Sequence, residues 1–250
     1  MKLKTFFFKN LKSFIILLFI CIFLYTLYNL FYYYYEPDGT EYYYDNNDKK
    51  NKNIKFILLR HGERPDNPSF YTELNEKGIE QSKNIVNYFD KYNIDMVISS
   101  PFTRTLQTVT PYADKYNKDI NIENGLYEYR YNNYFSSDPT VYGIKDIKQQ
   151  QLLKHINNDY NSTIQLDELI LDRDKKNNII LETPEKLKKR VFKVFDEIFS
   201  NPKFENKTIL IVSHKGTINM IRNYLEQTNI KNDFNVRPYD FAHYIVYKTI

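Results

Sequence analysis

Three short segments of this 250-residue chain place histidine or arginine directly after apolar runs that are typical of buried strands. The segments are Arg60-His61-Gly62, Ser99-Ser100-Pro101 with Arg104 shortly after it, and Ser213-His214-Lys215-Gly216. A neutral imidazole can attack phosphorus, and guanidinium groups can hold phosphoryl oxygens by paired hydrogen bonds that strengthen as charge develops. If the three segments meet in space, these residue types predict phosphoryl chemistry.

The elements needed to bring the segments together alternate along the chain from residue 54 onward. The runs that favour strands cover 54–59, 94–99, 119–123, 207–214 and 243–248. The segments that favour helices cover about 75–92, 101–111, 145–158, 183–198 and 217–226, and Pro111 is expected to end or kink the second. The alternation predicts an α/β fold, a three-layer sandwich with a mostly parallel central sheet and helices on both faces. In such a sheet, ligands bind outside the carboxyl ends of the strands.

The N-terminal region predicts a membrane anchor. Residues 13–35 carry no charged side chain, and the 18-residue run 14–31 is nearly all apolar. At about 1.5 Å per residue, such a helix reaches roughly 27 Å, close to the ~30 Å hydrocarbon core of a bilayer. A cleaved signal peptide and a buried core helix are the alternatives. The length of the segment and the lack of a small-residue cleavage site favour an uncleaved transmembrane signal-anchor.

The charges around the anchor predict its orientation. Four lysines lie in the basic tail 1–12, and four acidic residues between 36 and 45 follow the apolar segment. The positive-inside rule therefore places the N-terminus in the cytosol and the body of the chain in a lumenal or extracellular space. Residues 36–53 are interpreted as a tether to a catalytic domain at 54–250. Sequons at Asn161 and Asn206 are compatible with that side, although chance explains them better in so Asn-rich a chain.

The body of the chain is formally neutral. Four of the 35 basic residues lie before Ser13, which leaves 31 to balance 31 acidic ones. No nucleic-acid partner is expected, because the bulk attraction to a phosphate backbone is missing. The only cysteine, Cys21, lies in the apolar segment and gives no indication of a disulfide.

The motifs of residues 54–250 resemble those of the histidine phosphatase superfamily, the phosphoglycerate-mutase-like proteins. In family order they are LLRHGER, ELNEKGIEQS, VISSPFTRTLQT, GLYEYR, LETPEKLKKR and ILIVSHKGTI. The resemblance implies that His61 is the nucleophile that forms a phosphohistidine, and that Arg60, Arg104 and His214 bind the phosphoryl group. It implies no metal or other cofactor. The Gln107-Thr108 pair resembles helix positions that support the pocket in this family.

The resemblance also implies a source for the proton that the leaving group needs. In the acid-phosphatase and phytase branch it is an Asp directly after the second histidine, where this chain has Lys215. In the mutase-like branch it is a Glu that GLYEYR places at Glu128, whereas Glu123 fits the pattern less well. The motifs are most similar to those of the ecdysteroid-phosphatase and protein-tyrosine-phosphatase-like members, and by that resemblance Arg64 is an additional phosphate ligand.

We therefore expect a membrane-tethered phosphomonoesterase whose substrate is a small-molecule or phosphopeptide phosphomonoester. A phosphoglycerate-type mutase and a catalytically silent phosphate-binding or scaffold protein are the alternatives. Specificity is expected to lie in the segments 129–180 and 67–72. The histidines His155 and His243 match no motif and are expected to be structural. Zinc binding by His61 and His214 has no third ligand in a recognisable spacing.

Overall fold

The computed structural model describes residues 22–26, 41–44, 53–66, 69–129, 154–165, 181–226 and 241–249. The internal contacts divide the chain into two units, Met1–Asp38 and Gly39–Ile250. In the first unit, residues 22–26 are helical, and the rest of the expected anchor lies outside the described residues. Across the described ranges, no helix combines the length and the apolar character needed to cross a membrane.

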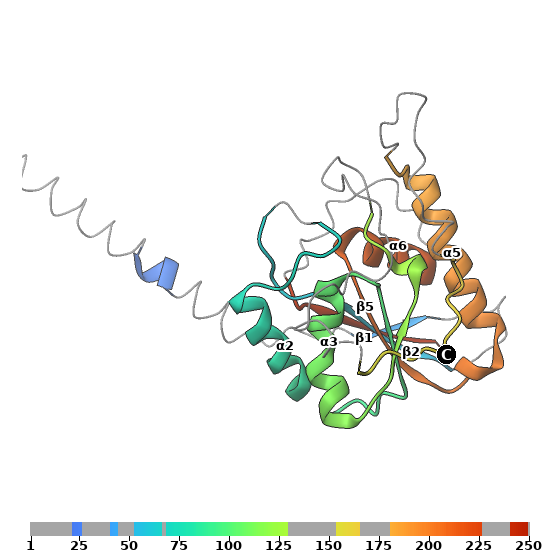
Figure 1. Cartoon of the computed structure of the whole chain (residues 1–250), viewed down its shortest axis with the longest axis horizontal. Coiled ribbons are helices and arrows are strands. Elements are labelled where there is room, and N and C mark those ends of the chain that lie inside the picture. Colours follow the sequence, from blue (N-terminus) through green and yellow to red (C-terminus); the bar gives the residue numbers. More distant parts are fainter. Residues whose placement is uncertain are drawn as a thin grey trace, which may run out of the picture. The chain divides into compact units, whose positions relative to one another are not determined.

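The second unit is built around a six-stranded sheet in the order β1-β6-β2-β5-β3-β4 (Figure 1). The strands are β1 Glu41–Tyr44, β2 Lys55–Arg60, β3 Met96–Ser99, β4 Ile120–Ile122, β5 Thr208–Ser213 and β6 Tyr244–Thr249. Strands β2, β5, β3 and β4 are parallel neighbours, and β6 runs antiparallel to β2. The predicted α/β fold with a mostly parallel sheet is confirmed. The edge strand β1, which pairs with β6, lies within the segment 36–53 that was interpreted as a tether.

Strands β2 and β5 form because their side chains are buried on both faces of the sheet. In β2, Phe56 and Leu58 join one apolar cluster, whereas Ile57 and Leu59 join a second cluster on the opposite face. Alternate residues of a strand point to opposite faces, so a strand covered on both sides must be apolar throughout. This accounts for the uninterrupted apolar runs in the sequence.

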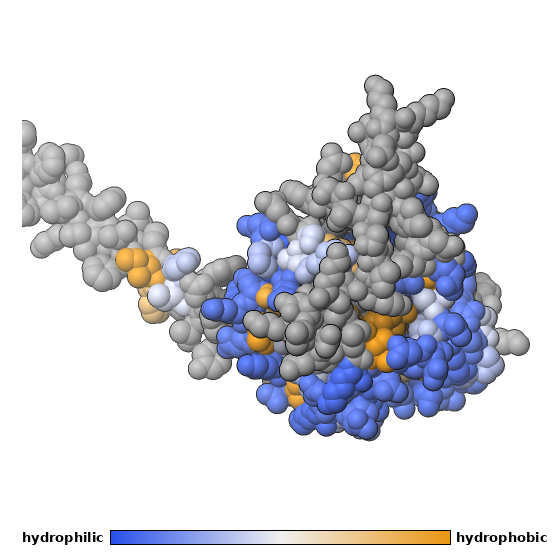
Figure 2. Space-filling model, viewed as in Figure 1, coloured by the Kyte–Doolittle hydropathy of each residue, from blue (hydrophilic) through white to orange (hydrophobic). Residues whose placement is uncertain are grey.

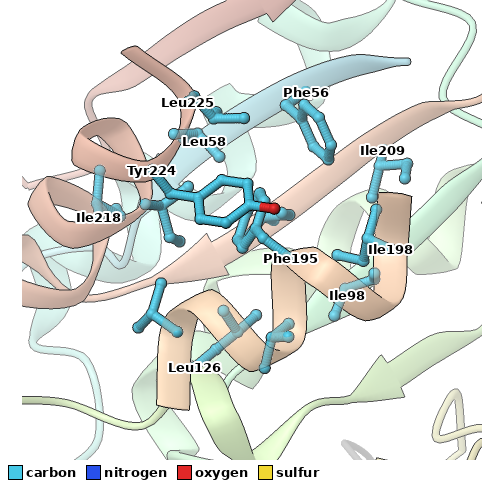
Figure 3. Close-up of a cluster of buried hydrophobic side chains, with 14 of the residues drawn as sticks. Phe56, Leu58, Ile98, Leu126, Phe195, Ile198, Ile209, Ile218, Tyr224 and Leu225 are labelled. Atoms are coloured by element: carbon cyan, nitrogen blue, oxygen red, sulfur yellow. The ribbon is translucent and has the colours of Figure 1, made fainter. Parts of the chain in front are cut away.

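Two pairs of helices cover the two faces. Helices α2 Glu76–Phe89 and α3 Thr103–Tyr116 supply one cluster, and α5 Pro184–Ser200 and α6 Lys215–Glu226 supply the other. Figure 3 shows the cluster that contains Phe56 and Leu58, in which Tyr224 and Phe195 lie among the aliphatic side chains of the strands and helices. The predicted start of α5 is confirmed, because the Thr183 hydroxyl caps the helix and Pro184 is its first residue. The described outer surface is mainly hydrophilic on the face seen in Figure 2.

The C-terminal ends of two predicted helices were wrong. Helix α3 continues through Pro111 to Tyr116, because Val109, Tyr112 and Ala113 bury its inner face and outweigh the proline penalty. Residues 154–158, which fall within the expected helix 145–158, form turns and an isolated bridge between Ile156 and Ile120. The rest of that expected helix lies outside the described residues.

Candidate active site

The carboxyl ends of β2, β5 and β3 lie side by side at one edge of the sheet. Arg60 at the end of β2 is in register with Ser213 at the end of β5, and Val212 is in register with Ser99 at the end of β3. The peptide N–H of His61 donates to the carbonyl of Ser213 at 3.0 Å. The parallel register therefore brings the three polar segments to one place.

His61 is held as a neutral imidazole with a lone pair on Nε2. Its Nδ1 lies 2.7 Å from the carbonyl oxygen of Gly62, and because a carbonyl can only accept, Nδ1 carries the proton. Burial is the main cause that lowers the pKa of His61 well below 6.5, and the charges of Arg104, Arg60 and Arg64 lower it further. A neutral ring with an exposed lone pair is the form that attacks phosphorus.

Helices α2 and α3 fix the loop that carries His61. The N–H of Gly62 donates to the Thr108 hydroxyl at 2.9 Å, and that hydroxyl donates to the carbonyl of Arg104 at 2.6 Å. A Cβ at Gly62 would lie 2.8 Å from the carbonyl oxygen of Gly78, and a Cβ at Gly78 would clash with the carbonyl oxygen of Glu63. The backbones approach so closely that neither glycine leaves room for a side chain.

Arg104 and Glu128 form the charged wall of the site. Arg104 is completely buried in the first turn of α3, and its Nη1 donates to the carbonyl of Ser69 at 2.9 Å. Its Nη2 donates to Oε2 of Glu128, whose side chain remains 17% exposed. The buried Nε has no hydrogen-bond partner in the described part of the chain. One donor of this guanidinium is thus available to an oxyanion.

His214 lies directly opposite His61, with 5.2 Å between the ring centroids. Its Nε2 is 2.9 Å from the hydroxyl of Ser100, and its Nδ1 is 3.6 Å from Oε2 of Glu128. Burial is again the main cause that lowers the pKa of His214 well below 6.5, followed by the charge of Arg104. Two neutral imidazoles therefore face one another inside a ring of cations.

The other two predicted arginines complete that ring. The Cζ atom of Arg60 lies 4.0 Å from the ring centroid of Phe241, which also contacts His61 at 5.6 Å between centroids. Arg64 is half-buried, and its Nη1 donates to the carbonyl of Pro65 at 2.8 Å. Its charge lowers the pKa of His61. The structure thus brings together all six site residues that the sequence indicated.

A buried network that sequence reasoning missed fixes the segment before Glu128. Glu123 precedes the short helix η1 Asn124–Leu126 and is completely buried. Its carboxylate accepts hydrogen bonds from the N–H groups of Gly125 at 2.9 Å and Thr163 at 2.8 Å, and from the Ser162 hydroxyl at 2.8 Å. Glu123 is therefore a structural group, and no sequence signal separates it from Glu128 except the family pattern.

A second missed residue, Arg190, ties α5 to the same segment. Its guanidinium donates to both carboxylate oxygens of Glu182, at 2.6 and 2.9 Å, and to the carbonyl of Gly125 at 2.6 Å. The sequence held a signal for this contact, because Arg190 occupies the same helical stripe as the buried Leu187 and Val194. A charged residue in an apolar stripe predicts a buried partner.

The structure also places the other residues that the sequence singled out. The Gln107-Thr108 pair supports the site, since Gln107 accepts from the N–H of Leu74 at 2.7 Å. His155 pairs with Asp114 at 2.7 Å, and it is the backbone carbonyl of His243 that accepts from the N–H of Arg60. Within the described ranges, no three His, Cys, Asp or Glu side chains are grouped so that they could hold a metal ion.

A comparison with protein-family models matches residues 56–247 to the histidine phosphatase superfamily, branch 1. The chain belongs to this superfamily. No curated protein sequence matches it. The two histidines, the arginines and the neighbouring carboxylate thus lie within the matched region of a histidine phosphatase superfamily member.

Solved structures of phosphatases share the fold at low sequence identity. A mycobacterial glucosyl-3-phosphoglycerate phosphatase with inorganic phosphate is 16% identical over 77% of this chain and 88% of its own, with a TM-score of 0.54. The ecdysone phosphate phosphatase of Bombix mori is 17% identical over 75% and 83%, with a TM-score of 0.50. A phosphoserine phosphatase of Entamoeba histolytica is 18% identical over 77% and 89%, also with a TM-score of 0.50. At these identities the likeness shows the fold alone.

Proposed function

We propose that this histidine phosphatase superfamily member hydrolyses phosphomonoesters through a covalent phosphohistidine on His61. The observation that carries the proposal is the geometry of the buried imidazole. The Gly62 carbonyl accepts the hydrogen bond of Nδ1–H, which leaves the lone pair on Nε2. The charges of three arginines lower the pKa of the ring, and one of them, Arg104, binds the carboxylate of Glu128.

In the first step, Nε2 of His61 attacks phosphorus and the bond between phosphorus and the leaving oxygen breaks. The guanidinium groups of Arg60, Arg64 and Arg104 hold the phosphoryl oxygens, where their forked donors stabilise the charge of the transition state. The carboxylic acid of Glu128 gives its proton to the leaving oxygen, so the products are a free alcohol and phosphohistidine.

Hydrolysis of the phosphohistidine restores the enzyme. In the second step the resulting carboxylate accepts a proton from water as the water attacks phosphorus. The phosphorus–nitrogen bond breaks, its electrons return to Nε2, and inorganic phosphate leaves.

The test is a single-turnover reaction of the full-length chain, kept in a mild detergent because residues 13–35 are apolar. The enzyme is mixed with a radiolabelled aryl phosphate and quenched, and acid-labile, base-stable phosphoprotein is measured. Label is expected on the wild type and on the control His155→Gln, whose ring pairs with Asp114 outside the site. No label and no turnover are expected for His61→Ala. Undiminished hydrolysis by His61→Ala would overturn the proposal.

The two alternatives have separate readouts. A phosphoglycerate-type mutase would isomerise a phosphoglycerate in the presence of a bisphosphoglycerate primer. A silent phosphate-binding or scaffold protein would show a phosphate-dependent thermal shift without turnover of any ester. The carboxylate of Glu128 favours hydrolysis over silence, because it remains partly exposed next to His214 and Arg104, where hydrolysis needs a general acid.

The substrate class is approached with a panel of monoesters. The structural neighbours are named for ecdysone phosphate, phosphoserine and glucosyl-3-phosphoglycerate, so a steroid phosphate, a phosphoamino acid and a sugar phosphate belong in the panel. A phosphotyrosyl peptide tests the macromolecular alternative. The substrate with the highest kcat/KM defines the class, and equal kcat/KM values across the panel would mean that the site selects only the phosphoryl group.

We also propose that residues 13–35 form a single-pass signal-anchor, with 1–12 cytosolic, 36–53 as the connection and the catalytic domain 54–250 lumenal or extracellular. The apolar length and the flanking charges support this topology. Asn161 and Asn206 are both exposed, so a lumenal domain offers two accessible sequons. A glycosidase-sensitive mobility shift that disappears in Asn161→Gln with Asn206→Gln, together with protection from external protease in sealed microsomes, is the expected result. Digestion of the domain in sealed microsomes would contradict it.

A further inference from the structure

We propose that the hydroxyl of Ser100 fixes the tautomer of His214, so that Nδ1 of that ring becomes a hydrogen-bond donor to the phosphoryl group. The phosphoryl part of this inference rests on the proposed function. The tautomer rests on contacts among described residues alone. Ser100 touches His214 and no reacting atom, so it is a positioning residue.

The position of Ser100 is fixed by its own backbone. The residue is completely buried, and its N–H donates to the carbonyl of Val212 at 2.9 Å. Its carbonyl accepts from the hydroxyl of Thr105 at 2.8 Å and from that of Ser99 at 2.9 Å. The backbone therefore cannot move away from β5, and the hydroxyl stays 2.9 Å from Nε2 of His214.

The direction of this hydrogen bond follows from where the hydroxyl proton can go. Within the described residues, Oγ of Ser100 has no hydrogen-bond partner besides Nε2 of His214. If Nε2 carried a proton and donated, the buried hydroxyl proton of Ser100 would be left without an acceptor, which costs about 1–3 kcal/mol. If the hydroxyl donates instead, Nε2 accepts and both groups are satisfied. Nε2 therefore carries the lone pair.

The other end of the ring leads to the same assignment. Nδ1 of His214 is buried, has no hydrogen-bond partner in the described residues and lies 3.6 Å from a carboxylate oxygen of Glu128. A lone pair facing a carboxylate is repelled, whereas an N–H dipole is attracted. Burial and the charge of Arg104 lower the pKa of His214, so the ring carries one proton, and both neighbours place it on Nδ1.

The two buried histidines are thus held in the same Nδ1–H tautomer, but a different ring nitrogen of each one faces the substrate. His61 uses its Nδ1–H on the Gly62 carbonyl and keeps the Nε2 lone pair for attack. His214 uses its Nε2 lone pair on Ser100 and keeps the Nδ1–H as a donor to a phosphoryl oxygen. A neutral donor suits a site that must still release phosphate, because a fourth cation beside the three arginines would bind the product more strongly.

The first test needs no substitution. In the full-length chain labelled with nitrogen-15 histidine and kept in detergent, the spectrum of wild-type His214 should show a proton on Nδ1 and a bare, hydrogen-bonded Nε2. The resonances are assigned by their loss in His214→Gln. A proton on Nε2 in the wild type would overturn the proposal, because Ser100 would then be the acceptor.

The second test is kinetic. Ser100→Ala should lower kcat/KM for an aryl phosphate about tenfold, the usual worth of one hydrogen bond, and should weaken inhibition by inorganic phosphate in parallel. Ser100→Thr keeps the hydroxyl and should restore most of the activity together with the wild-type His214 spectrum. The matched control is Ser82→Ala, which removes another buried serine hydroxyl, one that donates to the carbonyl of Ile79 within α2. This variant should change neither kcat/KM nor the His214 spectrum.

The outcomes separate the two proposals. A wild type without turnover would remove the proposed function, while the spectrum of His214 still tests the tautomer. A wild type that turns over, with Ser100→Ala equal to it in kcat/KM and in the His214 spectrum, would remove only the inference about Ser100. Loss of activity in Ser100→Ala with an unchanged spectrum would also contradict it, because the loss would then be structural.

Discussion

The two carboxylates Glu123 and Glu128 lie five positions apart, and replacing each by glutamine should have opposite effects. Glu123 is completely buried, and its carboxylate accepts hydrogen bonds from the N–H of Thr163 and the hydroxyl of Ser162. Glu128 is partly exposed and contacts Arg104 and His214. We expect Glu123→Gln to lower the free energy of unfolding with little effect on turnover. We expect Glu128→Gln to abolish turnover with a smaller loss of stability, because the glutamine oxygen can still accept a hydrogen bond from the buried Arg104.

The magnitude for Glu123→Gln follows from its donors. A glutamine replaces one acceptor oxygen by an NH₂ group, and every neighbour of that oxygen is itself a donor. With the NH₂ on the Oε2 side, the N–H of Thr163 loses its acceptor at 2.8 Å, while the Oε1 bonds to Gly125 and Ser162 are kept in a weaker, uncharged form. An orphaned buried donor costs about 1–3 kcal/mol, and hydrogen bonds to a charged group are worth about 1.5–3 kcal/mol. We therefore expect a loss of about 3 kcal/mol.

Urea denaturation of full-length wild type and both variants measures the free energy of unfolding, and an aryl phosphate assay at a temperature where all three are folded measures kcat/KM. Glu205→Gln, at an exposed position, serves as the control for removing one carboxylate. A stability of Glu123→Gln within about 1 kcal/mol of the wild type would refute the hydrogen-bond argument, since single surface changes already reach about half that size. Full activity of Glu128→Gln would refute its assignment as the acid.

Three further predictions concern stability and pH. Because burial keeps His61 and His214 neutral, the unfolded chain binds more protons than the folded one below the ordinary pKa of 6.5; stability should be complete above about pH 6.5 and fall as the pH drops below it, which urea titrations at several pH values would show. Arg190→Met removes the guanidinium that pairs with the buried Glu182 carboxylate and should cost about 3–5 kcal/mol, with a smaller loss in the double variant that also carries Glu182→Gln, as chemical denaturation would show. Gly78→Ala should lower both the melting temperature and kcat/KM, because the added methyl group displaces the loop that carries His61, and a normal kcat/KM would show that this loop can yield.

The sequence predicts the sheet well because the strands are buried on both faces. An uninterrupted apolar run such as 54–59 is typical of a strand that is covered on both faces. The helices that follow the strands supply the crossovers that parallel strands need. Proline was misleading in α3, where Pro111 sits inside the helix. Its local penalty is a few kcal/mol, and the packing of α3 on α2 and the sheet outweighs it. Tertiary burial decides such cases, and a single sequence shows it only indirectly.

The sequence predicts those site residues in which a histidine or arginine follows the end of an apolar strand. It does not predict the buried polar groups that hold other site residues in place. His61, His214 and Arg104 follow from strand ends in a parallel sheet. Glu123 and Ser100 do not, because a buried acceptor or donor differs from an exposed one only in its neighbours across the fold. Hydrogen-bond satisfaction of buried groups is a property of the three-dimensional structure, so these positioning contacts emerge only once the elements are placed.

The charges of the site fit a phosphomonoester once both imidazoles are taken as neutral. Arg60, Arg64 and Arg104 contribute three positive charges and the Glu128 carboxylate contributes one negative charge, which leaves a formal charge of +2. A phosphomonoester dianion carries the matching charge of −2, and the proton that Glu128 gives to the leaving oxygen is taken up in addition. Protonation of either buried histidine would raise the positive charge of the empty site, and for His61 it would also remove the lone pair that attacks phosphorus. The burial that lowers both histidine pKa values therefore has two effects. It keeps the His61 nucleophile reactive, and it stops the site from gaining positive charge that would hold the phosphate product.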